Sequence, residues 1–244
     1  MIGVLRPDLL VGKAAVISGA ANGIGAAAAL EIAAAGADVL LLDVVAPDAT
    51  VDAIRAAGGS ARGLAVDIRD REGLSAAMAT LDRLDILVTA AGIYGAPNSL
   101  EEIDVEEFDR VIDVNLKGTL WTIAAGLPLL RVRGGNIVAV GSAAGKIGGV
   151  IAGPHYVSSK GAIHAALKWV ARTEAANGIV ANGVAPGPIE TAMISGRGYS
   201  PDSTTVGRIG TPSEVGGLIA FLASPGASYM TGAVVDVNGG LAMT

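Results

Sequence analysis

Ala14-Ala15-Val16-Ile17-Ser18 is a short apolar run, followed at once by Gly19-Ala20-Ala21-Asn22-Gly23-Ile24-Gly25 and by an alanine-rich stretch up to Ala35. This order predicts a buried strand, a glycine turn and a helix, which is the context that makes a glycine pattern informative. Gly19 permits a tight turn. Gly23 and Gly25 let the backbone approach a phosphate at the helix N-terminus, where unpaired N–H groups and the helix dipole favour an anion. The alternative is that these glycines only turn the chain.

A second expected strand, residues 38–43, ends in Asp43, 18 residues after Gly25. In a dinucleotide-binding fold, a carboxylate at this place accepts hydrogen bonds from the adenosine ribose. It would also repel a 2′-phosphate, because two like unit charges 4 Å apart cost roughly 4 kcal/mol at an effective dielectric of 20. No basic residue immediately follows Asp43, and Asn22 rather than a basic residue precedes Gly23. NAD is therefore favoured over NADP, unless Asp43 is only a solvated strand end.

Strand-like and helix-like stretches alternate along the rest of the chain. We expect strands at 61–66, 85–89, 136–140, 179–185 and 233–237, and helices at 48–57, at 101–130, from 156 onward and at 212–223. The alternation predicts an α/β fold, a doubly wound, Rossmann-like parallel sheet of seven strands with right-handed crossovers. No linker, repeat or low-complexity tail interrupts it, so residues 1–244 are expected to form a single domain.

Asp67 and Ile68 follow the third expected strand, at the edge where open α/β sheets bind ligands. Asp67 is placed to meet an adenine amino group, or alternatively to cap the next helix.

Tyr156-Val157-Ser158-Ser159-Lys160 opens a long helix-like run. Residues four apart lie one turn apart on the same face of a helix, so Tyr156 and Lys160 are expected to be neighbours. A fixed ammonium nearby favours the phenolate and is expected to lower the tyrosine pKa from its usual value of ~10. Such a hydroxyl can exchange a proton with a substrate oxygen. A Tyr–Lys pair also arises by chance, so its meaning depends on the rest of the chain.

Composition excludes several classes of protein. Hydrophobic residues make up 51% and charged residues 16%, which suits a parallel sheet buried on both faces. The longest uncharged run, 215–235, is interrupted by glycines and by Ser224-Pro225-Gly226, so we expect helix, turn and strand rather than a membrane span. A net charge of −6 and few aromatics disfavour a nucleic-acid partner, and without cysteine no disulfide or thiolate metal site is possible. Residues 1–11 have no apolar signal-peptide core, so a cytoplasmic protein is expected.

Together these stretches resemble the short-chain dehydrogenase/reductase family over nearly the whole chain. The run from Ser18 to Gly25 is similar to its T-G-x-x-x-G-x-G pattern, with serine in place of threonine, and Tyr156 and Lys160 match its Y-x-x-x-K. The resemblance implies a catalytic tetrad of Asn115, Ser142, Tyr156 and Lys160. It implies no metal, and cofactor contacts at Gly19, Asn22, Gly23, Ile24, Gly25, Asp43, Asp67, Ile68, Ala91, Gly92, Tyr156, Lys160, Pro186, Gly187, Ile189 and Thr191.

One stretch departs from the family. Thr89-Ala90-Ala91-Gly92 stands where the family usually has N-N-A-G. The loss of two asparagines is expected to loosen either the support that this strand gives to the central helix or its cofactor contacts.

The resemblance implies reversible hydride transfer between a nicotinamide and a carbonyl or secondary-alcohol carbon. Tyr156 would exchange the proton of the substrate oxygen, and Lys160 would lower its pKa and hold the nicotinamide ribose. Ser142 would hydrogen-bond the substrate oxygen, and Asn115 would hold a water linked to Lys160. The expected function is therefore NAD(H)-dependent interconversion of a secondary alcohol and a ketone. The nearest alternative is a 3-oxoacyl thioester reductase acting on acyl-carrier protein or CoA. A remote alternative is a non-catalytic dinucleotide-sensing regulator, although such relatives usually lack the Tyr or the Lys.

Two loops are expected to set substrate specificity. Residues 146–154 are mostly apolar (Ile147, Val150, Ile151), whereas residues 193–210 are polar at their tip and form a candidate mobile lid. With no obvious basic anchor, they favour a small hydrophobic ketone or alcohol.

Other residues near the motifs allow more than one interpretation. His155 either lines the substrate pocket or is an exposed turn residue, and His164 is more often a packing residue. Small residues on the helices that contain Asn115 and Tyr156 allow close helix–helix approach. The family resemblance implies a homotetramer, which the sequence alone does not separate from a dimer.

Overall fold

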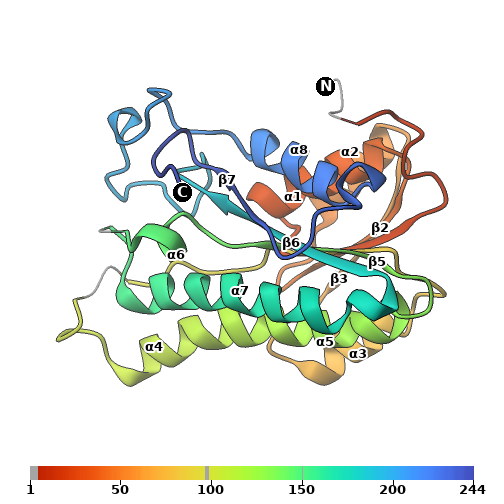
Figure 1. The fold of residues 1–244 in the computed structure, drawn as a ribbon, viewed down its shortest axis with the longest axis horizontal. Coiled ribbons are helices and arrows are strands. Elements are labelled where there is room, and N and C mark those ends of the chain that lie inside the picture. Colours follow the sequence, from red (N-terminus) through yellow and green to blue (C-terminus); the bar gives the residue numbers. More distant parts are fainter. Residues whose placement is uncertain (1–4, 97–98, 150) are drawn as a thin grey trace.

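The computed structural model describes residues 5–96, 99–149 and 151–244. Its centre is one parallel sheet of seven strands in the order β3-β2-β1-β4-β5-β6-β7 (Figure 1). The strands are β1 Ala14–Ser18, β2 Asp38–Asp43, β3 Ser60–Ala65, β4 Ile86–Thr89, β5 Gly135–Val140, β6 Ile179–Pro186 and β7 Val234–Val237. The predicted fold class is confirmed, and each strand lies within one residue of its predicted bounds.

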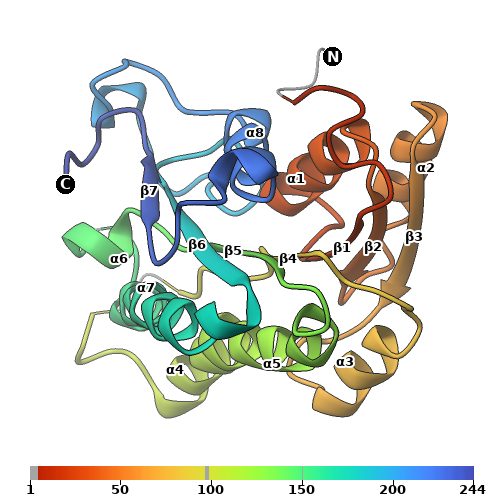
Figure 2. The same cartoon turned by 45° about the vertical axis from the view of Figure 1, so that its right-hand side comes forward.

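Helices cover both faces of the sheet (Figure 2). One face carries α1 Gly23–Ala34, α2 Asp48–Ala56 and α8 Pro212–Leu222. The other carries α3 Arg71–Met78, α4 Val105–Ile112, α5 Thr119–Leu130 and α7 Pro154–Thr173. Each face has its own apolar core, so the strands are buried from both sides, which accounts for the high hydrophobic content.

The strand order reverses direction at β1. This strand pairs with β2 on one side and with β4 on the other, so the connections after β1 and β4 run to opposite faces of the sheet. The loops at their carboxyl ends therefore diverge and leave a crevice, which is where open α/β sheets bind ligands. The fold thus brings the glycine turn after β1 and the segment after β4 to the two sides of one opening.

The predicted helix 101–130 is wrong in its detail. Regular helix begins only at Val105, because the Asp104 side chain accepts a hydrogen bond from the Glu107 N–H at 2.7 Å and caps the first turn. Residues 113–118 form a π-helical segment, Asp113–Gly118, between α4 and α5. Such segments occur frequently at functional sites, and this one contains Asn115.

Three further predictions concern local segments. Residues 146–154 contain the end of a short helix that was not predicted, α6 Ala144–Ile147, while Val150 lies outside the described residues. The uncharged run 215–235 divides into α8, the 3₁₀ turn Pro225–Ala227 and the first residues of β7, as predicted. Among the described residues, no helix is long and apolar enough to cross a membrane. Residues 1–4 of the segment considered for a signal peptide are likewise outside them.

Candidate active site

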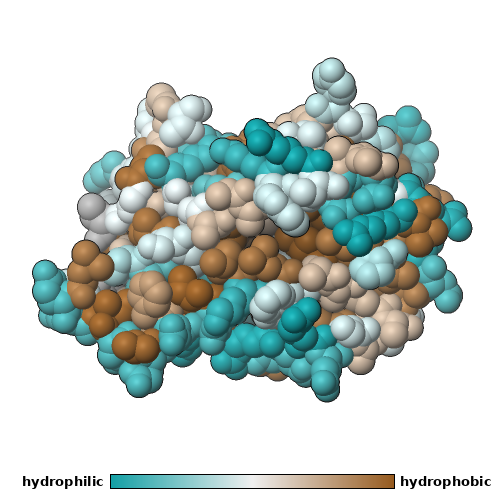
Figure 3. All heavy atoms as spheres, turned by 60° about the horizontal axis from the view of Figure 1, so that its bottom comes forward, coloured by the Kyte–Doolittle hydropathy of each residue, from teal (hydrophilic) through white to brown (hydrophobic). Residues whose placement is uncertain are grey.

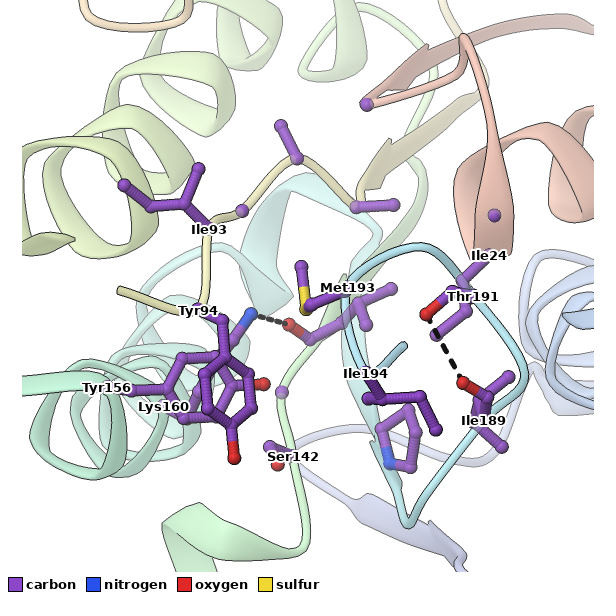
Figure 4. Close-up of a pocket in the computed structure, with 18 of the residues that line it drawn as sticks. Ile24, Ile93, Tyr94, Ser142, Tyr156, Lys160, Ile189, Thr191, Met193 and Ile194 are labelled. Atoms are coloured by element: carbon purple, nitrogen blue, oxygen red, sulfur yellow. Dashed lines mark hydrogen bonds between the residues drawn. The ribbon is translucent and has the colours of Figure 1, made fainter. Parts of the chain in front are cut away.

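A cavity of about 690 Å³ opens at the carboxyl ends of the strands (Figure 4). It extends from the glycine turn and the end of β2 to the start of α7 and the lid, residues 193–210. The predicted site residues that line it are Gly19, Asn22, Gly23, Ile24, Gly25, Asp43, Asp67, Ile68, Ala91, Gly92, Ser142, Tyr156, Lys160, Pro186, Gly187, Ile189 and Thr191. Of the predicted site residues, Asn115 alone is not in this lining.

Two glycines of the turn, Gly19 and Gly25, leave no room for a side chain. Gly19 has φ +71°, and a Cβ on it would lie 2.4 Å from the Ala91 nitrogen. A Cβ on Gly25 would lie 2.0 Å from the Gly19 carbonyl oxygen. Asn22 is the N-cap of α1, but its side chain makes no capping hydrogen bond. The first N–H groups of α1 therefore face the cavity with no side-chain acceptor from this cap, and they fit the pyrophosphate of a dinucleotide.

Asp43 is fixed beside this turn. One carboxylate oxygen accepts a hydrogen bond from the Ala21 N–H at 3.0 Å, and the other accepts one from the Val45 N–H at 3.3 Å. Each oxygen has a further lone pair, and the side chain is partly exposed to the cavity. The carboxylate is therefore available to the hydroxyls of an adenosine ribose.

Asp67 is held by Arg69, a lining residue that the sequence reasoning missed. The two side chains form a bidentate pair with a shortest distance of 2.6 Å, and the hydrogen bond from Arg69 lowers the pKa of Asp67. The alternative that Asp67 caps the next helix is wrong, because the Asp70 side chain accepts the Glu72 N–H and caps α3. Contact with adenine stays a prediction for Asp67.

Asn115 is buried and ties together three parts of the site. Its side-chain oxygen accepts the Ile93 N–H at 2.8 Å, and its side-chain nitrogen donates to the Ile93 carbonyl at 2.9 Å and to the Ser159 hydroxyl at 3.0 Å. A Cβ on Gly92 would lie 3.2 Å from the Asn115 oxygen and 3.4 Å from the Lys160 ammonium nitrogen. Asn115 thus fixes the segment after β4 against α7. Its expected role at a water molecule stays a prediction.

Ser142, Tyr156 and Lys160 meet on the substrate side of the cavity (Figure 4). The Lys160 ammonium donates to the Val140 carbonyl at 2.9 Å and lies 5.8 Å from the centre of the Tyr156 ring. Burial lowers the pKa of Lys160 to about 8, so the Lys160 side chain is still mostly charged at neutral pH. Ser142 follows β5, and its hydroxyl accepts the Ala144 N–H at 3.1 Å, which fixes it on the turn into α6.

The expected lowering of the Tyr156 pKa is wrong for this structure. Burial raises the pKa of Tyr156 to about 12, and the hydrogen bond with Ser142, which lowers it, does not offset this effect. The physical reason is that the phenol is almost fully enclosed, so the charged phenolate loses its hydration. Tyr156 is therefore protonated at neutral pH.

Further residues on the substrate side were missed by the sequence reasoning. Tyr94 stacks on Tyr156 with ring centroids 4.7 Å apart, and its hydroxyl lies 2.6 Å from the hydroxyl of Tyr199 in the lid. The chain contains only four tyrosines, and the positions of these two in loops beside the motifs were the available signal.

The two histidines lie close to the site without lining the cavity. His155 is fully buried, so the alternative of an exposed turn residue is wrong; its Nε2 lies 3.6 Å from a Glu107 carboxylate oxygen. His164 is a packing residue, as expected, and its Nε2 accepts the Ser142 N–H at 3.4 Å. This bond requires a neutral imidazole, which agrees with a pKa that burial lowers to about 4.

The departure from the family pattern at Thr89 places a polar side chain in the core. Thr89 is 2% exposed, and among the described residues its hydroxyl has no hydrogen-bond partner. The central helical segment is nevertheless held to this strand's loop through Asn115 and Ile93. The absence of the two asparagines at positions 89 and 90 therefore leaves the connection between Asn115 and Ile93 in place.

The sheet order, the glycine turn at a helix N-terminus and the acidic end of β2 define a nicotinamide-dinucleotide oxidoreductase of the Rossmann type. Comparison with known proteins gives the family. Residues 19–242 match the family described as Enoyl-(Acyl carrier protein) reductase. The chain is 37% identical to the short-chain reductase protein NovJ of Streptomyces niveus, over 93% of this chain and 92% of the relative.

Two further similarities agree with this result. The chain is 36% identical to a cyclohexanol dehydrogenase of Rhodococcus sp. (strain TK6), over 95% of this chain and 97% of the relative. It superimposes on the crystal structure of a 3-oxoacyl-[acyl-carrier protein] reductase with bound NAD from Brucella melitensis with a TM-score of 0.91 and 35% identity, covering 98% of this chain and 94% of that one. The chain belongs to the short-chain dehydrogenase/reductase family. It is an oxidoreductase that acts on CH–OH groups and interconverts secondary alcohols and ketones with a nicotinamide dinucleotide.

Proposed function

We propose that this enzyme is an NAD(H)-dependent dehydrogenase of compact, uncharged secondary alcohols and ketones, with Tyr156 as the proton donor and acceptor. The observation that carries the proposal is the meeting of Tyr156, Ser142 and Lys160 at the substrate end of the cavity whose other end holds the glycine turn and Asp43. The nicotinamide supplies or takes the hydride. The residues of the chain transfer the proton and position the substrate.

In the direction of reduction, Tyr156 gives its proton to the substrate oxygen, for which a pKa of about 12 keeps it protonated. Ser142, which lines the cavity beside Tyr156, holds the substrate oxygen next to the phenol. Lys160 keeps a positive charge near the phenolate that proton transfer leaves. In the direction of oxidation the same groups work in reverse, so oxidation is expected to speed up as the pH rises.

Asp43 supports the preference for NAD. Its carboxylate, fixed by Ala21 and Val45, offers acceptors to ribose hydroxyls and repels a 2′-phosphate. The charged residues that line the described part of the cavity are Asp43, Asp67, Arg69, Arg110 and Lys160.

The substrate end supports an uncharged substrate. Of the basic side chains in the described lining, Arg110 is paired with Glu107 at 2.7 Å, and Lys160 donates to the Val140 carbonyl at 2.9 Å beside Tyr156. The other walls of the substrate end include Ile147, Ile151 and Met193. A small apolar ketone or alcohol suits such a surface, as the cyclohexanol dehydrogenase relative illustrates.

A 3-oxoacyl thioester reductase remains the second candidate, favoured by the similarity to the Brucella melitensis reductase. A non-catalytic dinucleotide sensor is disfavoured by the presence of both Tyr156 and Lys160 in the cavity.

The assembly and setting are also proposals. We propose a homotetramer in the cytoplasm, with residues 1–244 as one domain and residues 193–210 as its substrate lid. Apolar side chains form a band across the face that carries α4, α5 and α7 (Figure 3). On these helices, Trp169 of α7 is 65% exposed and Phe108 of α4 is 38% exposed, so a second copy of the chain would bury them.

The test is turnover of a panel of ketones and secondary alcohols, followed by the near-ultraviolet absorbance of reduced nicotinamide with both NADH and NADPH. Tyr156→Phe is expected to bind NADH normally and to lose turnover about 100-fold to 10,000-fold. Tyr229→Phe makes the same chemical change at a fully exposed position and is the matched control. Retained turnover in Tyr156→Phe would refute the role of the tyrosine, and a higher rate on 3-oxoacyl thioesters would favour the second candidate.

A further inference from the structure

Two residues of the lid, Arg197 and Tyr199, contact Tyr94 in the segment after β4. The Tyr199 and Tyr94 hydroxyls lie 2.6 Å apart and share a hydrogen bond. The Arg197 guanidinium carbon lies 4.5 Å from the centre of the Tyr94 ring, and one of its N–H groups donates to the Gly95 carbonyl at 3.3 Å. The lid is thus joined to this segment by a side-chain hydrogen bond, a cation–π contact and a bond to the backbone. We call Tyr94, Arg197 and Tyr199 the lid latch.

The latch is in direct contact with the proton donor. The Tyr94 ring stacks on the Tyr156 ring, with centroids 4.7 Å apart and an angle of 28° between the planes (Figure 4). Both side chains are buried, with Tyr94 5% and Tyr156 7% exposed. Two lid residues, Met193 and Tyr199, pack against the same aromatic cluster. The position of the Tyr156 ring therefore depends on a residue that the lid itself holds.

We infer that Tyr94 positions Tyr156 through its ring and sets substrate specificity through its hydroxyl, which latches the lid over compact substrates. The inference rests on the proposed function and deepens it. A closed lid completes the enclosure around a small cyclic ketone and excludes water from it. A thioester must keep its long arm outside while its keto carbon reaches Tyr156, so a lid latched to the segment after β4 obstructs it.

Three substitutions separate the two roles of Tyr94. Tyr94→Phe keeps the stacked ring and removes the latch hydroxyl, and Tyr199→Phe removes the same hydrogen bond from the lid side. Tyr94→Leu removes the ring itself. Tyr229→Phe is the control for a lost phenol hydroxyl at an exposed position.

For the latch, each of the two Phe variants is expected to raise the KM of a compact cyclic ketone about threefold to tenfold, the effect of one neutral hydrogen bond. Because both remove the same bond, the double variant is expected to match either single one. The ratio of kcat/KM for the cyclic ketone over a 3-oxoacyl thioester is expected to fall. Additive effects of the two substitutions, or an unchanged ratio, would overturn the latch.

For the positioning role, Tyr94→Leu is expected to lower kcat a further threefold to tenfold below Tyr94→Phe, because an aromatic stack is lost in addition. Equal kcat values in the two variants would overturn it.

A readout that needs no turnover is amide hydrogen exchange of residues 193–205. Exchange is expected to rise equally in Tyr94→Phe and Tyr199→Phe and to stay unchanged in Tyr229→Phe. Unchanged exchange in either latch variant overturns the inference. If no ketone is turned over by the native chain, the proposed function fails while this measurement still decides whether the latch exists.

Discussion

Replacing Asp43 by Asn tests the proposed preference for NAD most directly. Asparagine keeps the shape of the side chain and one oxygen that can still accept the Ala21 N–H, but removes the negative charge. One like-charge pair at 4 Å costs roughly 4 kcal/mol at an effective dielectric of 20, and partial exposure of Asp43 reduces this to about 1–2 kcal/mol. NADH in turn loses a charge-assisted hydrogen bond in favour of a neutral one, which costs about 1 kcal/mol. The sum is roughly 2–3 kcal/mol.

That sum corresponds to a rise of about 30-fold to 160-fold in the ratio of kcat/KM for NADPH over NADH. The assay is the initial rate with each coenzyme at saturating ketone. Asp38→Asn is the matched control, because Asp38 begins the strand that Asp43 ends and loses the same charge about 17 Å away. An unchanged ratio in Asp43→Asn, or the same rise in Asp38→Asn, would refute the assignment of Asp43 to the adenosine ribose.

Three further predictions follow from the geometry. Gly25→Ala places a Cβ 2.0 Å from the Gly19 carbonyl, so the turn must shift and NADH affinity in a fluorescence titration should fall about tenfold or more; unchanged affinity would contradict the phosphate role. Thr89→Val removes a buried hydroxyl that has no hydrogen-bond partner among the described residues, so it should raise the unfolding free energy by ~1 kcal/mol and the Tm by about 2–4 °C. A lower Tm in a thermal melt would mean that the hydroxyl does have a hydrogen-bond partner. Lys160→Met should abolish turnover and yet stabilise the fold at pH 7 by roughly 1–3 kcal/mol, because burial lowers the pKa of Lys160 to about 8 and the charged form therefore favours the unfolded state. The loss of unfolding free energy that charged Lys160 causes is at its full size below pH 8 and shrinks as the pH rises toward 10.5. Denaturant unfolding should therefore show a smaller difference in unfolding free energy between the two proteins at pH 10 than at pH 7.

The sheet could be predicted almost completely from the sequence, because its signals are local. Each strand is a short apolar run of about the length that a doubly buried strand needs, and a glycine or an aspartate marks where it ends. The helices were harder where polar capping decides the boundary. Asp104 rather than Glu101 caps α4, since the Asp104 carboxylate accepts the free N–H of Glu107. The π-helical segment around Asn115 has no such signal, because no periodicity distinguishes it from the α-helices on either side.

The electrostatics of Tyr156 show a second limit. A lysine four residues along the helix indicates a nearby charge, and this was the basis for expecting a lowered tyrosine pKa. The cost of burying the phenolate depends on which loops cover the ring, and those loops come from distant parts of the chain. Burial is the larger effect, so the pKa of Tyr156 rises to about 12. The spacing of charged residues can therefore be inferred from a sequence, whereas the solvation of a charged group depends on the fold.

The two ends of the cavity also differ in whether their features are local in the sequence or form only in the fold. At the cofactor end, the expected phosphate contacts are backbone groups of the glycine turn, and a seven-residue pattern, Gly19 to Gly25, encodes them. The substrate end depends on side chains that meet only in the fold: Tyr94 and Tyr199 are 105 residues apart, and neither belongs to a repeated pattern. A family can therefore keep its cofactor end recognisable while two loops change the substrate end, since substitutions there alter contacts that the glycine turn does not share. Exchanging residues 193–210 between two relatives should therefore transfer substrate preference and leave the NADH dissociation constant within about threefold.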